Sequence, residues 1–151
     1  MSNGYSILPP VYDRWQRTYG KDFSSLILPR FLSSLRLHRV PKSPMLDLAC
    51  GTGTLALMMA RRGWEVWGVD ASEGMITEAK RKSARKRLPA KFLCQDMRAL
   101  HLPVQVGVVT SFFDSINPLM TRKDLLATFR AVHACLAPGG FFVFDVNNEL
   151  C

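Results

Sequence analysis

The sequence predicts one α/β domain built on a doubly wound parallel sheet with helices on both faces. After residue 44, short apolar runs alternate with stretches of helical periodicity, which is the pattern of strand–helix–strand units. The apolar runs are continuous rather than alternating in polarity, as expected for strands buried on both sides. A length of 151 residues and a hydrophobic content of 48% suit a single soluble globular domain.

The first 40 residues are expected to form a segment that covers the core, which itself occupies residues 41–151. Residues 1–22 are rich in Tyr and Trp and show no clear periodicity, so no regular element is predicted there. Residues 23–37 carry an apolar side chain at every fourth position, which predicts a helix that Pro29 starts or kinks.

Strands and helices then alternate along the rest of the chain. Strands are predicted at 45–50, 65–69, 92–94, 104–112 and 141–146, and helices at 54–62, 72–87 and 121–135. Ser72 and Thr121 are typical N-caps of the last two helices. Gly63 and Pro89 follow the ends of the first two, as helix-terminating residues do.

Several suggestive residues lie where strands end, and ligands of doubly wound sheets bind beyond the carboxyl ends of the strands. Gly51 and Gly53 follow the first strand and leave the backbone open to a ligand. Free N–H groups at the start of the next helix favour an anionic group. Asp70 ends the second strand about 20 residues later, where it can accept hydrogen bonds from ribose hydroxyls. The sequence therefore predicts a site for a ribose-bearing cofactor.

Two cofactors compete for this site. The stretch from Gly51 to Ala56 satisfies the G-x-G-x-x-G/A pattern, so an NAD(P)-binding oxidoreductase domain is one alternative. Asp47, just before the glycines, would repel a pyrophosphate but attract an ammonium or a sulfonium. S-adenosylmethionine carries both cations together with a carboxylate and a ribose, so the charge argument favours it. In the other interpretation, Asp47 merely bonds loop amides.

Five segments in order resemble the motifs of class I S-adenosylmethionine-dependent methyltransferases of the small-molecule type. They are MLDLACGTGTLA, VWGVDASEGMI, FLCQDMRAL, FFDSIN and LAPGGFFVFDV, and VYDRW near the N-terminus resembles the family's aromatic entry segment. The resemblance runs from about residue 10 to residue 148. It implies a Rossmann-like sheet in the order 3-2-1-4-5 and methyl transfer to a small-molecule acceptor.

The resemblance also implies cofactor-binding positions, which fall into five groups. The groups are the methionine end (Ala49, Gly51 and Gly53), the ribose (Asp70, followed by Ala71), the adenine (Met75, Asp96 and Met97), the N-terminal cover (Tyr12 and Trp15) and the vicinity of the transferable methyl (Ser111 and Phe112). The charge argument adds Asp47 to the methionine end. Ala49 replaces the family's usual first glycine, a mild change provided that this position does not adopt a positive φ.

The chain departs most from the family at its end. It stops at Cys151, shortly after the fifth strand, whereas members normally continue with another helix and strands six and seven. We therefore expect a partial chain, or one completed by another copy, that binds the cofactor without full activity. An unpaired fifth strand would be an edge through which a homodimer could form. A non-catalytic, cofactor-binding partner subunit is a further alternative.

No catalytic residue is assigned from the sequence, because methyl transfer depends mainly on positioning and needs a base only if the acceptor must lose a proton. Asp114, Asn117 and Asp145 are the polar candidates at the strand ends. The three histidines are isolated in the sequence, and no metal-ligand cluster is predicted. Asn117-Pro118 lacks the following aromatic residue of amino-methylating DNA enzymes, so a nucleic-acid substrate is not favoured.

The remaining composition is that of an ordinary cytoplasmic protein. Much of the net charge of +8 comes from residues 72–91, whose basic side chains are expected on the solvated outer face of one helix, with a phosphate-binding patch as the alternative. The four cysteines show no pairing pattern and are expected to be free thiols in a reducing compartment. Neither a signal peptide nor a membrane span is predicted.

Overall fold

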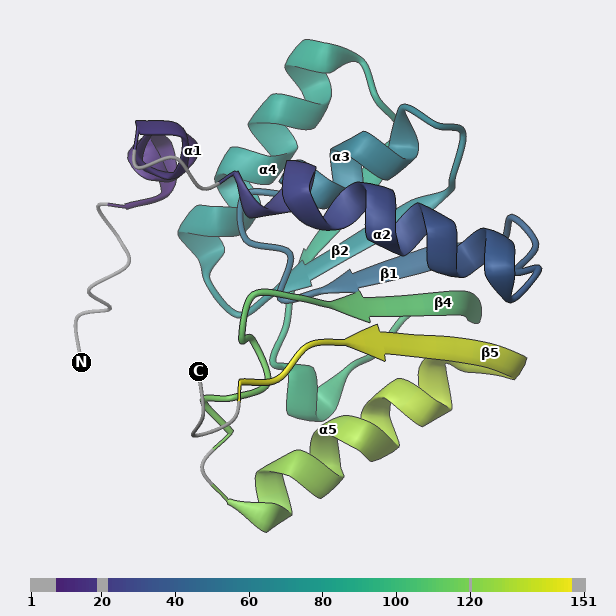
Figure 1. The fold of residues 1–151 in the computed structure, drawn as a ribbon. Helices are drawn as coiled ribbons and strands as arrows, with labels where there is room; N and C mark the ends of the chain where they lie inside the picture. Colours follow the sequence, from purple (N-terminus) through teal and green to yellow (C-terminus); the bar gives the residue numbers. More distant parts are fainter. Residues whose placement is uncertain (1–7, 19–21, 120, 148–151) are drawn as a thin grey trace.

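The computed structural model describes residues 8–18, 22–119 and 121–147 and contains a five-stranded sheet in the order β3-β2-β1-β4-β5 (Figure 1). Its strands are β1 (Met45–Leu48), β2 (Val66–Asp70), β3 (Ala90–Cys94), β4 (Val106–Ser111) and β5 (Leu136–Phe144). Every neighbouring pair is parallel. The predicted class and strand order are therefore confirmed.

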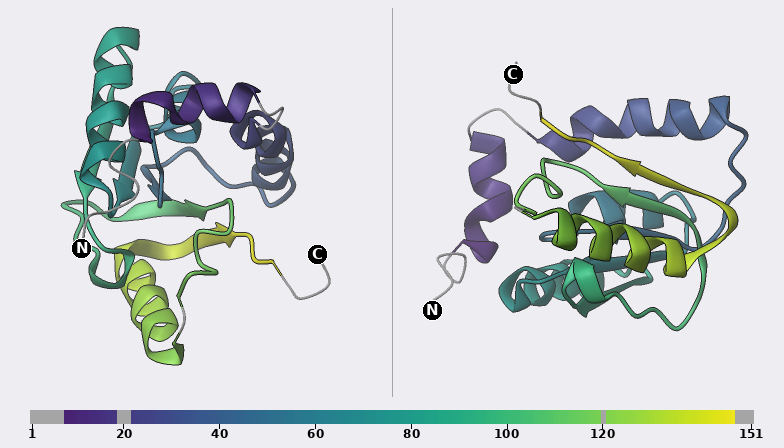
Figure 2. Two further views of the ribbon diagram at one scale, coloured as in Figure 1. Left: turned by 90° about the vertical axis from the view of Figure 1, so that its left-hand side faces the viewer. Right: turned by 90° about the horizontal axis from the view of Figure 1, so that it is seen from below.

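Helices cover both faces of the sheet (Figures 1 and 2). They are α1 (Pro9–Thr18), α2 (Phe23–Leu37), α3 (Thr54–Ala60), α4 (Glu73–Lys86), α5 (Arg122–Cys135) and the short 3-10 helix η1 (Met97–Ala99). On one face, α2, α3 and α4 contribute to a single core cluster, and on the other face α5 and the residues around η1 contribute to a second. Among the described residues, no helix is long and apolar enough to cross a membrane.

The pleat of β1 explains how one short strand serves both cores. Met45 packs in the cluster with α2 and α3, whereas Leu46 and Leu48 pack in the cluster with Val132 of α5. All three are at most 1% exposed, because successive side chains point to opposite faces and both faces are covered. A central strand this apolar leaves Asp47, the one charged residue in it, in buried surroundings.

Helix α1 corrects the expectation that residues 1–22 are irregular. Its sequence, PPVYDRWQRT, begins with two prolines, which are tolerated in the first turn because the N–H groups there have no helical partner. Residues 1–7 and 19–21 of that segment, like Cys151, lie outside the described part of the chain. The predicted division of the chain at residue 40 stays a prediction.

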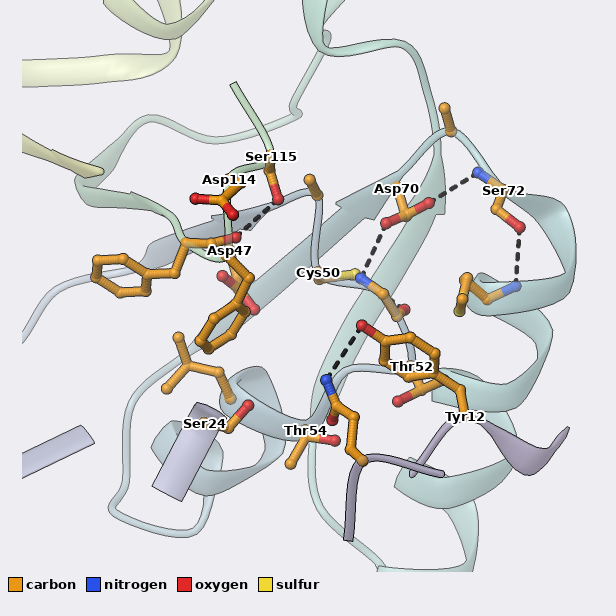
Figure 3. A pocket seen from close by; sticks show the side chains of 18 of the residues that line it. Tyr12, Ser24, Asp47, Cys50, Thr52, Thr54, Asp70, Ser72, Asp114 and Ser115 are labelled. Atoms are coloured by element: carbon orange, nitrogen blue, oxygen red, sulfur yellow. Dashed lines mark hydrogen bonds between the residues drawn. The ribbon is translucent and has the colours of Figure 1, made fainter. Parts of the chain in front are cut away.

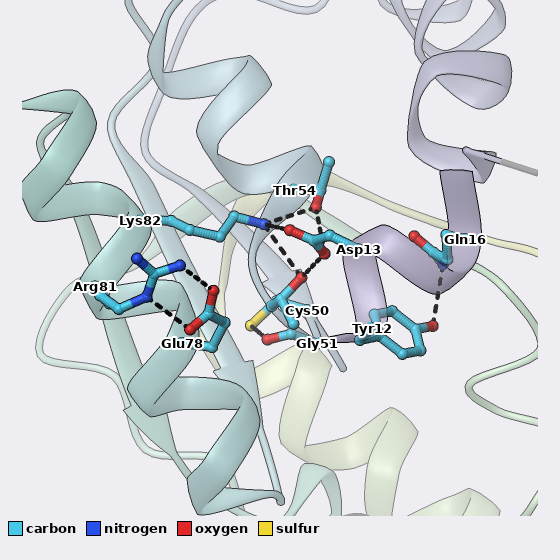
Figure 4. Close-up of polar contacts among 10 residues, drawn as sticks. Tyr12, Asp13, Gln16, Cys50, Gly51, Thr54, Glu78, Arg81 and Lys82 are labelled. Carbon is cyan, nitrogen blue, oxygen red and sulfur yellow. Dashed lines mark hydrogen bonds and ion pairs between the residues drawn. The ribbon is translucent and has the colours of Figure 1, made fainter. Parts of the chain in front are cut away.

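The N-terminal helix also corrects the interpretation of the basic segment. Most basic side chains of α4 are exposed, as expected, but Lys82 is only 5% exposed. It is buried because α1 lies against that side of α4 and supplies Asp13 as an ion-pair partner (Figure 4). An amphipathic pattern that considers α4 alone could not reveal a cover made by a helix that was not predicted.

Strand β5 forms one edge of the described sheet and begins earlier than predicted, directly after α5. Phe141 and Phe144 are each more than one third exposed along it. The cysteines that the structure describes (Cys50, Cys94 and Cys135) are free thiols, as expected. Pairing of the β5 edge with a second copy stays a prediction.

Candidate functional site

A cavity of about 490 Å³ lies at the carboxyl ends of the central strands, where the sequence predicted a ligand (Figure 3). Side chains from α1 and α2 line it together with the loops after β1, β2 and β4. Its lining includes Tyr12, Gln16, Ser24, Asp47, Ala49, Cys50, Gly51, Thr52, Asp70, Ala71, Met75, Phe112, Phe113, Asp114, Ser115 and Pro118. Over the described residues, no group of His, Cys, Asp or Glu is arranged to hold a metal ion.

The loop between β1 and α3 turns through three left-handed residues, Ala49 (φ 57°), Gly51 (φ 55°) and Gly53 (φ 76°). No atom lies within 4 Å of the position that a Cβ on Gly51 would take, so the backbone is open to the cavity there. A Cβ on Gly53 would lie 2.8 Å from the ring of Phe92, so this glycine permits close packing of the loop on β3. The condition under which Ala49 would be a mild replacement for glycine is not met, because Ala49 adopts a positive φ, a conformation that favours glycine.

The carboxylate of Asp70 fixes this loop from the end of β2. Its Oδ2 accepts a hydrogen bond from the Gly51 N–H at 2.9 Å, and its Oδ1 accepts one from the Ser72 N–H at 2.8 Å (Figure 3). Each oxygen retains a further acceptor position. Asp70 therefore joins the glycine loop to the start of α4 and can still accept hydrogen bonds from a ligand.

Asp47 is a buried acid beneath the same loop. It is 4% exposed, and its Oδ1 accepts a hydrogen bond from the Thr110 hydroxyl at 2.8 Å. Burial, together with the nearby charge of Asp70, raises the pKa of Asp47 to about 7, even though the Thr110 hydrogen bond opposes the rise. The Asp47 hydrogen bond thus comes from β4 rather than from loop amides. A cation in the cavity would stabilise the ionised form.

A second cavity, of about 310 Å³, adjoins the first and shares the lining residues Ala49, Asp70 and Ala71 with it. Asp96 and Met97 line only this second cavity. The Asp96 carboxylate accepts hydrogen bonds from the Arg98 guanidinium, and this contact holds the pKa of Asp96 below its usual value. Asp70 therefore stands between two adjoining cavities.

The structure brings together most, but not all, of the predicted positions. Met75 lines the first cavity, apart from the other residues expected around an adenine. Gly53, Ser111 and Trp15 line neither cavity. Ser111 is fully buried at the end of β4, whereas the Trp15 side chain is 52% exposed on α1, with its ring centroid 6.2 Å from that of Tyr12.

Sequence reasoning missed Gln16, which is 8% exposed and donates a hydrogen bond to the Tyr12 hydroxyl at 3.1 Å. The two residues lie four positions apart, so they share one face of α1. That spacing would have identified Gln16 if residues 9–18 had been recognised as a helix. Ser24, at the start of α2, is likewise a polar residue of the cavity that the sequence did not single out.

The loop after β4 carries a strained turn at the same cavity. Phe113 (φ 67°) and Asp114 (φ 59°) both adopt the left-handed conformation, which is costly for residues with a side chain. The Asp145 carboxylate accepts hydrogen bonds from both of their N–H groups, at 2.9 Å and 3.1 Å. Of the predicted base candidates, only Asp114 lines the cavity; Asp145 holds the turn, and Asn117 pairs with the backbone of Asn147.

Comparison with known proteins agrees with this geometry. Residues 45–140 match the family model described as a methyltransferase domain. The chain is 41% identical over 140 residues to the putative methyltransferase YqeM of Bacillus subtilis, covering 92% of this chain and 56% of that protein. It is 35% identical to a dTDP-3-amino-3,4,6-trideoxy-alpha-D-glucopyranose N,N-dimethyltransferase of Streptomyces venezuelae, covering 89% of this chain and 55% of the other.

Solved structures are similar as well. An S-adenosylmethionine-dependent methyltransferase from Clostridium acetobutylicum superposes with a TM-score of 0.79 at 31% identity, covering 97% of this chain and 58% of the other. The aminopentose methyltransferase CalS10 from Micromonospora echinaspora, solved with S-adenosylmethionine bound, gives a TM-score of 0.77 at 31% identity and covers 91% of this chain and 56% of the other.

The chain belongs to the methyltransferase-domain family, since the family model matches more than half of its residues. It spans about half the length of the curated relatives that it matches. The relatives named above are all methyltransferases, so they give no support to the oxidoreductase alternative.

Proposed function

We propose that the chain binds S-adenosylmethionine across the two adjoining cavities and serves methyl transfer to a small-molecule acceptor. The observation that carries the proposal is the position of Asp70, which lines both cavities and offers two carboxylate oxygens at their junction. A nucleoside that occupies both cavities would present its ribose hydroxyls to this carboxylate. The methionine portion would then extend into the first cavity and the adenine into the second.

The residues of the first cavity fit the charges of a methionine portion. Asp47 is an acid whose ionisation is disfavoured by burial, and an ammonium or a sulfonium nearby would offset that cost. The open backbone at Gly51 leaves room for the ligand against the loop. Tyr12 and Gln16 would cover the ligand from α1. A dinucleotide pyrophosphate, by contrast, would meet two carboxylates here, Asp47 and Asp70.

S-adenosylmethionine supplies an electrophilic methyl group for in-line displacement. The chain's own contribution would be to hold the acceptor in line and to exclude water, which can account for roughly 7–11 kcal/mol of barrier lowering in favourable cases. Phe112 and Phe113 line the first cavity and would form an apolar wall beside the acceptor, to which Asp114 would add a carboxylate. Such a wall and carboxylate suit a neutral or amine-bearing small molecule, consistent with relatives named as aminosugar methyltransferases. Asp114 would accept a proton if the acceptor must lose one.

The test is calorimetric titration of the purified chain with S-adenosylhomocysteine, beside NAD and an Asp70→Ala control. Binding of S-adenosylhomocysteine in the micromolar range, lost in the variant, is the expected result. Binding of NAD instead would overturn the proposal, as would equal affinity of the Asp70→Ala chain for S-adenosylhomocysteine. Methyl transfer itself would then be assayed with radiolabelled S-adenosylmethionine and panels of amines and phenols.

Two further proposals concern the cellular location and the self-association of the chain. A cytoplasmic location is supported by the free thiols among the described cysteines. Association through the β5 edge is supported by its half-exposed aromatic residues and would be tested by sedimentation velocity. Both stay predictions, and neither is needed for the proposed reaction.

A further inference from the structure

A buried polar network joins the N-terminal helix to the glycine loop and to α4 (Figure 4). The ammonium of Lys82 forms an ion pair with the Asp13 carboxylate and donates hydrogen bonds to the hydroxyls of Thr52, at 3.2 Å, and Thr54, at 3.0 Å. The Thr52 hydroxyl in turn donates to Asp13 at 2.5 Å. Lys82 is 5% and Thr52 3% exposed, so these two members are withdrawn from water, whereas the Asp13 side chain is 26% exposed.

The burial of Lys82 is what makes this contact different from a surface ion pair. Removing the partner of an exposed lysine changes the stability of a protein little. A buried ammonium that loses its carboxylate is left as an uncompensated charge, which is strongly destabilising. Lys82 has the long aliphatic stem needed to cross from α4 to α1. Thr52 belongs to the glycine loop and Thr54 begins α3, and both line the first cavity. The network therefore ties three separate segments together at one ammonium.

Few residues of helix α1 are buried. It contains ten residues, and a helix of that length is marginally stable alone in water. Only Pro9 and Gln16 are buried, whereas its large apolar side chains Val11 and Trp15 are about half exposed. Apolar burial therefore contributes modestly to its docking, and the ion pair with Lys82 supplies a directional contact in a buried setting.

The same helix presents Tyr12 and Gln16 to the first cavity, while Asp13 faces the network (Figures 3 and 4). Successive residues of an α-helix project about 100° apart, so anchoring Asp13 also fixes the orientation of its neighbour Tyr12. We propose that Asp13 and Lys82 are a positioning pair that docks α1 over the cofactor cavity and so sets the affinity of the site. This rests on the proposed function only in that the ligand is S-adenosylmethionine.

A second, apolar contact marks where α1 meets α4. A Cβ on Gly74, in the first turn of α4, would lie 2.9 Å from the Pro9 Cγ, closer than side chains tolerate. The missing side chain at Gly74 thus allows the start of α1 to approach α4 closely. Helix α1 is held at its beginning by this contact and in its middle by the Asp13–Lys82 pair, which accounts for its orientation across the cavity.

The experiment compares Lys82→Met with Lys80→Met in the full chain. Methionine keeps most of the aliphatic volume of Lys82, and Asp13 is exposed enough for water to solvate it, so the fold should persist. Lys80 is an exposed lysine of the same helix and serves as the matched control. The exchanged pair Asp13→Lys with Lys82→Asp keeps the combined reach of the two side chains with the charges reversed.

Two readouts separate docking from binding. Hydrogen exchange of residues 9–18, measured without ligand, reports whether α1 is docked, because the isolated helix would exchange rapidly. Titration with S-adenosylhomocysteine reports the effect on the cavity. We expect Lys82→Met to lose protection in α1 and to weaken binding on the order of tenfold, with both largely recovered in the exchanged pair. Lys80→Met should match the wild-type chain in both.

The inference is overturned if Lys82→Met keeps wild-type protection over α1, or if Lys80→Met loses as much protection there as Lys82→Met does. Loss of protection with unchanged affinity would overturn the role in ligand binding. Failure of the wild-type chain to bind S-adenosylhomocysteine would instead refute the proposed function, while the exchange experiment would still decide whether the pair docks α1. Circular dichroism of each variant confirms that the sheet remains folded.

Discussion

Replacing Asp47 by asparagine tests the electrostatics of the candidate site most directly. Asparagine has nearly the same shape, and its carbonyl oxygen can still accept the hydrogen bond from Thr110. What it removes is the ability to ionise in a buried position. The variant therefore separates the cost of a buried carboxylate from the packing of β1.

The magnitude follows from the pKa of Asp47, which burial raises from 3.8 to about 7. A shift of about 3 units corresponds to about 4 kcal/mol between the two protonation states. Because the folded state binds the proton more tightly, Asp47 stabilises the fold fully below the unfolded pKa, and this contribution is lost as the pH rises toward 7. Relative to wild type, Asp47→Asn should gain little stability near pH 4 and up to about 4 kcal/mol above pH 7.

Urea unfolding of both proteins, followed by circular dichroism between about pH 4 and pH 8, measures this difference. A difference in the free energy of unfolding that does not grow with pH would refute the assignment of a buried, proton-binding Asp47.

The same acid also predicts an effect of pH on ligand binding. If an ammonium binds beside Asp47, the wild-type chain should release a proton on binding S-adenosylhomocysteine near pH 6.5, seen by calorimetry as a dependence on buffer ionisation enthalpy. Asp47→Asn should show no such release, and absence of release in the wild type would contradict an Asp47–cation contact.

The remaining predictions concern backbone geometry. Asp70→Asn should weaken S-adenosylhomocysteine binding on the order of a hundredfold and lower the free energy of unfolding by about 1–3 kcal/mol. The reason is that one of the two amides bound to Asp70 loses its acceptor. Unchanged affinity by calorimetry would contradict this. Ala49→Gly should raise the free energy of unfolding by up to about 1 kcal/mol, since glycine removes the cost of a positive φ, and a loss in denaturant unfolding would argue against the left-handed conformation. Asp145→Ala should lower stability by about 2 kcal/mol in the same assay, because the Phe113 and Asp114 amides lose their acceptor, and a neutral result would mean that the turn does not depend on it.

The fold was predictable because its information is local in sequence. Continuous apolar runs and helix caps such as Ser72 and Thr121 define the strands and helices, and both caps are confirmed by hydrogen bonds from the helix N–H groups to the hydroxyls. The strand ends then place Gly51 and Asp70 together, and the 2.9 Å hydrogen bond between them is the contact expected from that topology.

What the sequence could not reveal depends on contacts between distant segments. Helix α1 carries apolar residues at helical spacing (Val11, Tyr12 and Trp15), but it is short, begins with two prolines and is polar on average, so it was not recognised as a helix. Without α1, nothing predicts that Lys82 is buried. The positive φ of Ala49 is likewise set by the loop as a whole, since alanine has no intrinsic preference for that conformation. The role of Asp145 depends on its reach across to the loop after β4, which strand pairing brings close.

Two buried ionisable groups near the cavity, Lys82 and Asp47, differ in how the protein compensates their charge. Lys82 is compensated internally, by Asp13 and two hydroxyls, so its buried charge is balanced without any ligand. Asp47 receives a single hydrogen bond from Thr110 and lies near a second carboxylate, so its ionised form is disfavoured, as its raised pKa reflects. A cation that enters the first cavity would therefore be bound most favourably beside Asp47, because it would stabilise the ionised carboxylate that the protein itself disfavours.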